Sequence, residues 1–102
     1  MIEEDLESGF AGIDEGIISK EKAQARKLRK SNWWRIKVSR GVCHYCGRSF
    51  APSELTMDHI VPLARRGKST RSNLVPACKD CNNRKKNMLP LEWQEYMENL
   101  DS

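Results

Sequence analysis

Four cysteines constrain this chain more than any other feature of its sequence. They form two Cys-x2-Cys pairs, Cys43/Cys46 and Cys78/Cys81, and 31 residues separate the two pairs. This spacing lets two thiolates of one tight turn reach a single ion, and two such turns complete the tetrahedral shell of a closed structural zinc site. The separation exceeds that of common zinc ribbons, so a structured insertion is expected between the pairs.

The size of the chain supports the same interpretation. With 102 residues, 38% hydrophobic and 31% charged, it can build one small core, and such a core usually needs a metal or disulfides as well. The acidic start at residues 1–5 lacks the pattern of a secretory signal, and no apolar run approaches a membrane span, so we expect an intracellular protein. An intracellular setting favours metal over disulfides. Two disulfides or redox-active thiols are the alternatives to zinc.

Basic residues are concentrated in two segments of the chain. Residues 20–40 hold nine Lys and Arg against the single acid Glu21, and residues 65–86 hold eight against Asp80. Residues 1–19 hold six acids and no base. Concentrated positive charge predicts a polyanionic partner, with nucleic acid as the first candidate. The competing interpretation is a solvated helix face that happens to be basic.

The N-terminal part is expected to contain one basic helix. Residues 1–18 are predicted to be weakly structured, and residues 19–102 to form a single domain. The helix should run from Lys20 to about Val38, because this stretch has no Gly or Pro, with Ser19 as its N-cap. Trp33 and Trp34 are expected to anchor its end onto the domain.

The remaining elements are expected to be strands followed by helices, which together with the basic helix gives an α+β fold. Residues 42–51 are typical of a short hairpin, and two strands are expected, at 55–61 and at 73–75 before Pro76. Helices are then expected at 79–88 and from Pro90 to about Asn99.

The insertion carries side chains suited to phosphodiester hydrolysis. His59 has an ordinary pKa near neutrality and can take a proton from water. Asp58 and Asn82 offer hard oxygen atoms, which suit Mg²⁺ or Mn²⁺ better than zinc. Neighbouring residues of a regular strand face opposite sides. Asp58 and His59 can therefore serve one site only if the strand bends or bulges, or if the ion lies at its edge.

The order of these residues resembles the HNH endonucleases. The resemblance covers roughly residues 42–86 and rests on the Asp-His-Ile-x-Pro-Leu run at 58–63, the Asn73-Leu74 step, and Asn directly after the last cysteine. It implies a ββα-metal core stabilised by the two Cys-x2-Cys turns, which are called zinc knuckles. The basic helix and a C-terminal helix would flank this core. Taken one at a time, His59 could be a structural histidine, Asp58 a surface acid and Asn73 a turn cap. These separate interpretations do not explain why the residues occur in this order.

The resemblance also implies the roles of individual residues. His59 would be the general base, Asn73 would order the loop and fix that base through its backbone, and a divalent ion would bind at Asp58 and Asn82. Many members of the family have histidine at the position of Asn82. Asn83 is an alternative ligand, because helix registers are uncertain by a residue when they are inferred from sequence. His44, inside the first knuckle, is interpreted as a surface residue or one that supports the zinc ligands.

Basic residues close to this motif are expected to contact DNA phosphates with little dependence on sequence. They lie in the loop between the strands and on the helix after the last cysteine: Arg65, Arg66, Lys68, Arg71, Arg84, Lys85 and Lys86. The predicted function is a Mg²⁺- or Mn²⁺-dependent endonuclease of double-stranded DNA, bacterial or from a phage, with a partner protein or a second copy for targeting. The alternatives are a non-catalytic, zinc-stabilised DNA-binding module and a zinc-stabilised protein adaptor.

Overall fold

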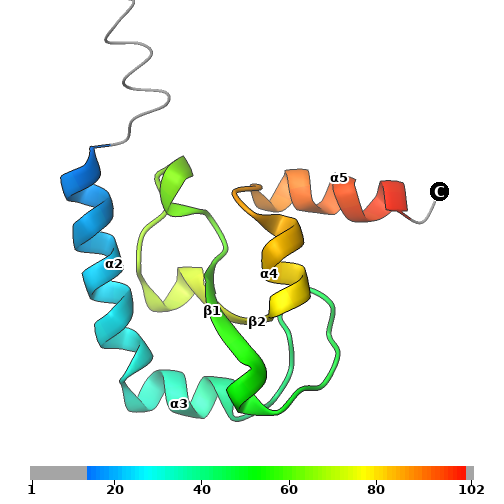
Figure 1. Cartoon of the computed structure of the whole chain (residues 1–102), viewed down its shortest axis with the longest axis horizontal. Helices are drawn as coiled ribbons and strands as arrows, with labels where there is room; N and C mark the ends of the chain where they lie inside the picture. The colour runs from blue at the N-terminus through cyan, green and yellow to red at the C-terminus, as the bar shows by residue number, and fades with distance from the viewer. Residues whose placement is uncertain (1–13, 101–102) are drawn as a thin grey trace, which may run out of the picture.

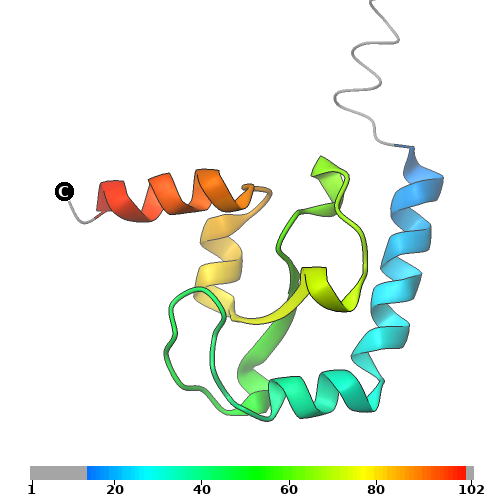
Figure 2. The same ribbon diagram turned by 180° about the vertical axis from the view of Figure 1, so that it is seen from behind.

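The computed structural model describes residues 14–100. Four α-helices surround a two-stranded antiparallel sheet within this range, which confirms the predicted α+β class. Strand β1 (Leu55–His59) pairs with β2 (Leu74–Cys78), and the register places Leu55 opposite Cys78 and His59 opposite Leu74. Helices α2 and α3 lie on one side of the sheet and below it, and α4 and α5 lie on the other side (Figures 1 and 2).

The basic helix begins earlier than predicted. Helix α2 spans Glu15–Arg29, and its N-cap is Asp14, which accepts a hydrogen bond of 2.8 Å from the backbone N–H of Gly16. The expectation that Ser19 caps this helix is therefore wrong, because Asp14 already provides the cap one turn earlier. Of the segment expected to be weakly structured, residues 15–18 are helical and residues 1–13 lie outside the described range.

The same segment is also interrupted, so the predicted continuous helix over 20–38 is wrong. A second helix, α3 (Asn32–Val38), follows a break at Lys30 and Ser31. The Ser31 hydroxyl donates to the carbonyl of Leu28 and accepts from the backbone N–H of Trp34, at 2.6 Å and 3.3 Å. It thus ends one helix and caps the next. The turn directs Trp34 inward, where it is buried.

Strand β2 continues through Pro76, contrary to the prediction that it ends before this residue. The carbonyl of Pro76 faces away from β1 and accepts a hydrogen bond of 2.9 Å from the backbone N–H of His44. In an antiparallel strand the N and the carbonyl of one residue point to the same side. The missing N–H of Pro76 therefore lies on the outer side of β2, where it removes no bond to β1.

Two other elements are shorter than predicted. Strand β1 ends at His59, where the chain bends, and α4 spans Lys79–Lys85 because Lys86 adopts a positive φ of 48°. The C-terminal helix α5 (Pro90–Leu100) starts at the predicted proline. Three short 3-10 helices complete the described elements, at Pro52–Glu54, Leu63–Arg65 and Arg71–Asn73.

The core forms around the cysteines. The predicted hairpin over 42–51 is reduced to an isolated bridge between Val42 and Ser49. Its turn packs with β2, α4 and α5 in one cluster of buried residues: Cys43, Ala77, Cys78, Cys81 and Trp93. Trp93 contacts the rings of Tyr45 and Tyr96, each at 5.6 Å between centroids. No helix in residues 14–100 is long and apolar enough to cross a membrane.

Candidate nuclease site

The four cysteine sulfurs converge on one point. They come from the turn after Val42 and from the junction of β2 and α4, and all lie within 4.8 Å of one another. Four thiolates around one zinc ion at Zn–S distances of about 2.3 Å lie about 3.8 Å apart in a tetrahedron. The separation of 4.0 Å between Cys46 and Cys78 Sγ is close to that value. All four cysteines are free, so the cluster fits a closed structural zinc site rather than two disulfides.

The thiols of the cluster differ in how readily they lose their protons. Burial raises the pKa of Cys46, but hydrogen bonds, first from the backbone and side chain of Arg48, outweigh this effect and lower the pKa to about 6. Burial, followed by hydrogen bonding to Cys78, raises the pKa of Cys81. Four thiolates this close together would repel one another, and a zinc ion between them would supply the compensating charge.

One pocket is lined by the three predicted site residues Asp58, His59 and Asn82. The prediction required them to share a site. The pocket has a volume of about 470 Å³ and lies where β1 ends, between α2 and the start of the segment 61–68. Asp58 and His59 can share it because the chain leaves the strand at His59, so the regular alternation of sides ends there. The other lining residues are Ile18, Lys22, Pro62, Leu63, Ala64, Lys86 and Asn87.

The carboxylate of Asp58 is held through one oxygen. Its Oδ2 accepts a hydrogen bond of 2.5 Å from the Tyr45 hydroxyl and pairs with the ammonium of Lys85 at 3.3 Å. Within residues 14–100 its side-chain hydrogen bonds involve Oδ2, which leaves Oδ1 for an ion. Tyr45 lies between the zinc-ligand candidates Cys43 and Cys46, so the first cysteine turn directly contacts Asp58, the candidate ion ligand.

Lys85 is not placed as predicted. Its side chain is fully buried, and its ammonium also donates to the backbone carbonyl of His59 at 3.0 Å. A side chain enclosed in this way cannot reach a DNA phosphate, so the expected DNA contact by Lys85 is corrected. The helix geometry explains the placement, because Lys85 follows Cys81 by one turn and shares its inward face.

Thr56 fixes the orientation of the Asn82 amide. The Thr56 hydroxyl donates to the carbonyl of Ala77 at 2.8 Å, so its oxygen must accept from Asn82 Nδ2, at 2.9 Å. Asn82 Oδ1 is then the amide atom available to a cation. Asn83, the alternative ligand, is exposed and does not line this pocket.

His59 is half-buried, and its ring contacts the loop between the strands. Its Nε2 lies 2.9 Å from the hydroxyl of Ser69. Burial lowers its pKa below the ordinary value of 6.5, although the nearby carboxylates of Asp58 and Glu21 raise it. The neutral form is therefore favoured at pH 7, as a general base requires.

Asn73 orders the loop, but it does so through Val61 rather than through the His59 backbone. Its Oδ1 accepts from the Val61 N–H at 2.9 Å, and its Nδ2 donates to the Val61 and Lys68 carbonyls at 3.0 Å and 2.8 Å. These three bonds hold the two ends of the loop segment 61–68 together. The contact to the His59 carbonyl comes from Lys85 instead.

The other basic residues predicted to contact DNA fall into two groups. Arg66, Lys68 and Lys86 are exposed near the pocket. The others have protein partners: Arg65 pairs with Glu92 at 3.1 Å, Arg84 pairs with Asp80 at 3.4 Å, and the guanidinium of Arg71 lies 5.6 Å from the Trp33 ring centre. Lys22 of α2 also lines the pocket, and nothing in the basic segment 20–40 distinguishes it from the other bases there.

Comparison with known proteins agrees with this geometry. Residues 43–88 match the model of the HNH endonuclease family, as the motif in this segment predicts. Over 67 residues, which are 63% of this chain, the sequence is 42% identical to the CRISPR-associated endonuclease Cas9 of Corynebacterium diphtheriae. The chain spans 6% of the length of that relative. Both similarities support a nuclease-type function.

Proposed function

We propose that this protein is a divalent-cation-dependent DNA endonuclease. The observation that carries the proposal is the single pocket in which Asp58, His59 and Asn82 meet. Each presents the atom that phosphodiester hydrolysis needs: a free carboxylate oxygen, a neutral imidazole and an amide oxygen. Asp58 and Asn82 would hold Mg²⁺ or Mn²⁺, since both ions accept a few oxygen ligands and keep waters for substrate. The four cysteines would hold zinc.

The roles of the protein groups follow from this arrangement. His59 takes a proton from the attacking water, and Asn73 keeps the loop closed beside it. A bound divalent ion would stabilise the negative charge that develops on the phosphate. Tyr45 and Lys85 hold the Asp58 carboxylate, so the ligand is positioned before an ion arrives.

The proposed substrate is double-stranded DNA. Lys22 and Lys86 line the pocket, and Arg66 and Lys68 are exposed on the adjoining loop, where they line a neighbouring pocket. They would neutralise phosphates on either side of the cleaved bond, with affinity that falls as salt increases. No set of side chains suited to reading base edges is recognisable around the pocket, so we expect little sequence preference.

A plasmid-cleavage assay tests this function. The zinc-loaded protein should nick supercoiled DNA with Mg²⁺ or Mn²⁺ and not with EDTA. His59→Ala should reduce the rate by about 10²–10⁴-fold, the range that general-base catalysis contributes. His44→Ala is the matched control, because His44 is the other histidine and lies outside the pocket. It should cleave at the wild-type rate.

The same assay distinguishes the alternative. If the protein shifts DNA in a gel but does not cleave it with any divalent ion tested, the endonuclease proposal is wrong. The non-catalytic DNA-binding module is then favoured. Equal cleavage by wild type and His59→Ala would instead reject His59 as the base.

A further inference from the structure

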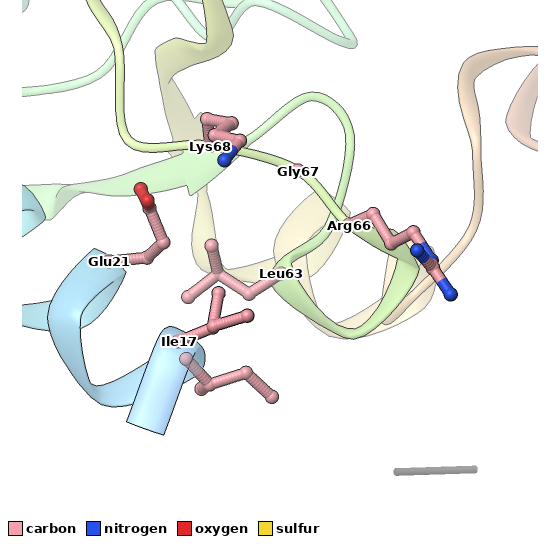
Figure 3. A pocket seen from close by; sticks show the side chains of 7 residues that line it. Ile17, Glu21, Leu63, Arg66, Gly67 and Lys68 are labelled. Carbon is pink, nitrogen blue, oxygen red and sulfur yellow. The ribbon is translucent and has the colours of Figure 1, made fainter. Parts of the chain in front are cut away.

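The only acid among the bases of segment 20–40 reaches into the loop beside the catalytic centre. Glu21 lies on α2, outside the HNH segment, and its Oε1 accepts the backbone N–H of Ser69 at 2.6 Å. The Ser69 hydroxyl lies 2.5 Å from the backbone carbonyl of Glu21. Figure 3 shows Glu21 pointing from α2 towards the chain beside Lys68, with the apolar side chains of Ile17 and Leu63 next to it.

The direction of these hydrogen bonds is fixed by chemistry. A carbonyl oxygen only accepts, so the single hydroxyl hydrogen of Ser69 is donated to Glu21. The Ser69 oxygen can then only accept from His59, whose Nε2 lies 2.9 Å away. His59 Nε2 must therefore carry a hydrogen, and in the neutral ring the lone pair is on Nδ1.

We propose that Ser69 and Glu21 are positioning residues that hold His59 in its Nε2–H form, so that Nδ1 is the atom that takes the proton from water. This assignment deepens the proposed function and rests on it. It also assigns a role to α2: the helix completes the catalytic centre by anchoring its base. Ser69 is almost fully buried, with 4% of its surface exposed, so water does not substitute readily for its hydrogen bonds.

Nuclear magnetic resonance of the ¹⁵N-labelled, zinc-loaded full chain tests the hydrogen bond without requiring cleavage. At a pH where His59 is neutral, the wild type should show a His59 Nε2–H proton that is protected from exchange with water, and an unprotonated Nδ1. Ser69→Ala should lose that protected signal, and Ser69→Thr, which keeps the hydroxyl, should retain it. A wild-type proton on Nδ1 would overturn the proposal.

Kinetics separate positioning from mere stabilisation. Ser69→Ala should lower kcat about tenfold with KM unchanged, the factor that corresponds to one hydrogen bond. Ser69→Thr should restore kcat. A Ser69→Ala protein that loses thermal stability but keeps kcat within twofold would show that Ser69 only ties the loop, and the proposal would fail.

Glu21 provides an independent variant in case Ser69→Ala folds poorly. Glu21→Gln keeps an oxygen that can accept the Ser69 N–H and should retain both kcat and the protected proton. Glu21→Ala keeps the backbone carbonyl but leaves the Ser69 N–H without its acceptor, so it should reduce kcat and weaken the protection of the proton. Glu15→Ala, an exposed acid on the same helix, is the control and should change neither. Normal kcat in Glu21→Ala would contradict the proposal. If the wild type cleaves no DNA while the protected proton is present, the proposed function fails and the hydrogen-bond assignment stands.

Discussion

At the residue scale, Lys85 is the buried charge beside the proposed catalytic centre. Its ammonium is fully buried and lies between the Asp58 carboxylate and the His59 carbonyl. It also lies 5.5 Å from the centre of the Tyr45 ring, a face that attracts cations. Burying a charge is costly, and the cost is offset only when partners surround it on all sides, as they do here.

Replacing Lys85 should therefore destabilise the protein. We expect Lys85→Met, which keeps most of the side-chain volume, to lower the free energy of unfolding by about 3–5 kcal/mol, because Asp58 loses its buried counter-ion. Urea denaturation of the zinc-loaded protein measures this change. Lys79→Ala, an exposed lysine on the same helix, should stay within about 0.5 kcal/mol of wild type. A similar small effect for Lys85→Met would mean that the buried pair contributes little.

The sequence predicts the cysteine cluster and the lining of the pocket better than the residues that support them. The spacing of the cysteines predicted their convergence, and the resemblance to the HNH motif selected Asp58, His59 and Asn82, which line one pocket. Lys85 was misplaced because a lysine in a basic run is ordinarily exposed. Its position one turn after Cys81 was a usable signal, since Cys81 had to face inward. Nothing in the sequence indicates the contacts of Tyr45 and Ser69, which depend on segments far apart in the chain.

At the scale of elements, the loop 61–68 depends on a close backbone approach at Gly67. A Cβ on this residue would lie 1.7 Å from the Val61 carbonyl oxygen and 2.9 Å from that of Pro62. Gly67 thus allows its backbone to approach the Val61 backbone closely. The Asn73 side chain then hydrogen-bonds to the carbonyls of both Val61 and Lys68. Together they fix the end of the loop, next to which Ser69 bonds to Glu21 of α2.

Gly67→Ala should open this loop. We expect a loss of about 3 kcal/mol in unfolding free energy, the upper end of the range for overpacking, together with reduced DNA cleavage. Gly47→Ala is an informative comparison, because Gly47 has a positive φ of 73° but no atom within 4 Å of an added Cβ. Its cost should be only the conformational one, about 1–2 kcal/mol. Equal costs at both positions would show that the loop adapts to the clash.

Element boundaries were predicted less well where tertiary contacts set them. The start of α5 at Pro90 follows from local chemistry alone, and it was predicted correctly. The break between α2 and α3 was missed because the flanking residues are all compatible with helix, and burial of Trp34 favours the turn at Ser31. Strand β2 passes through Pro76 because the outer side of that strand meets His44, which no local pattern reveals.

At the scale of the whole molecule, the cysteine cluster is the centre of the core. The buried residues of the cluster include three of the four cysteines, and the two strands form a sheet too small to be stable by itself. A bound zinc would therefore contribute much of the folding free energy.

Removing zinc should unfold the protein cooperatively. A strong chelator should abolish the helical circular dichroism and shift tryptophan fluorescence to longer wavelength, because Trp34 and Trp93 become exposed. Added zinc should restore both signals. A reducing agent alone should leave them unchanged, since the cysteines are free thiols. Unfolding by reductant and resistance to the chelator would instead indicate disulfides.

The hydrogen bond from Tyr45 to Asp58 joins the cysteine cluster to the proposed catalytic centre. Tyr45 lies between Cys43 and Cys46, so the position of the Asp58 carboxylate depends on the shape of that turn. Under the proposed function, zinc bound by the cysteines would fix this turn and, through Tyr45, the carboxylate that recruits the second ion. A newly made copy without zinc would then bind the second ion less well, so DNA cleavage would follow maturation of the protein rather than precede it.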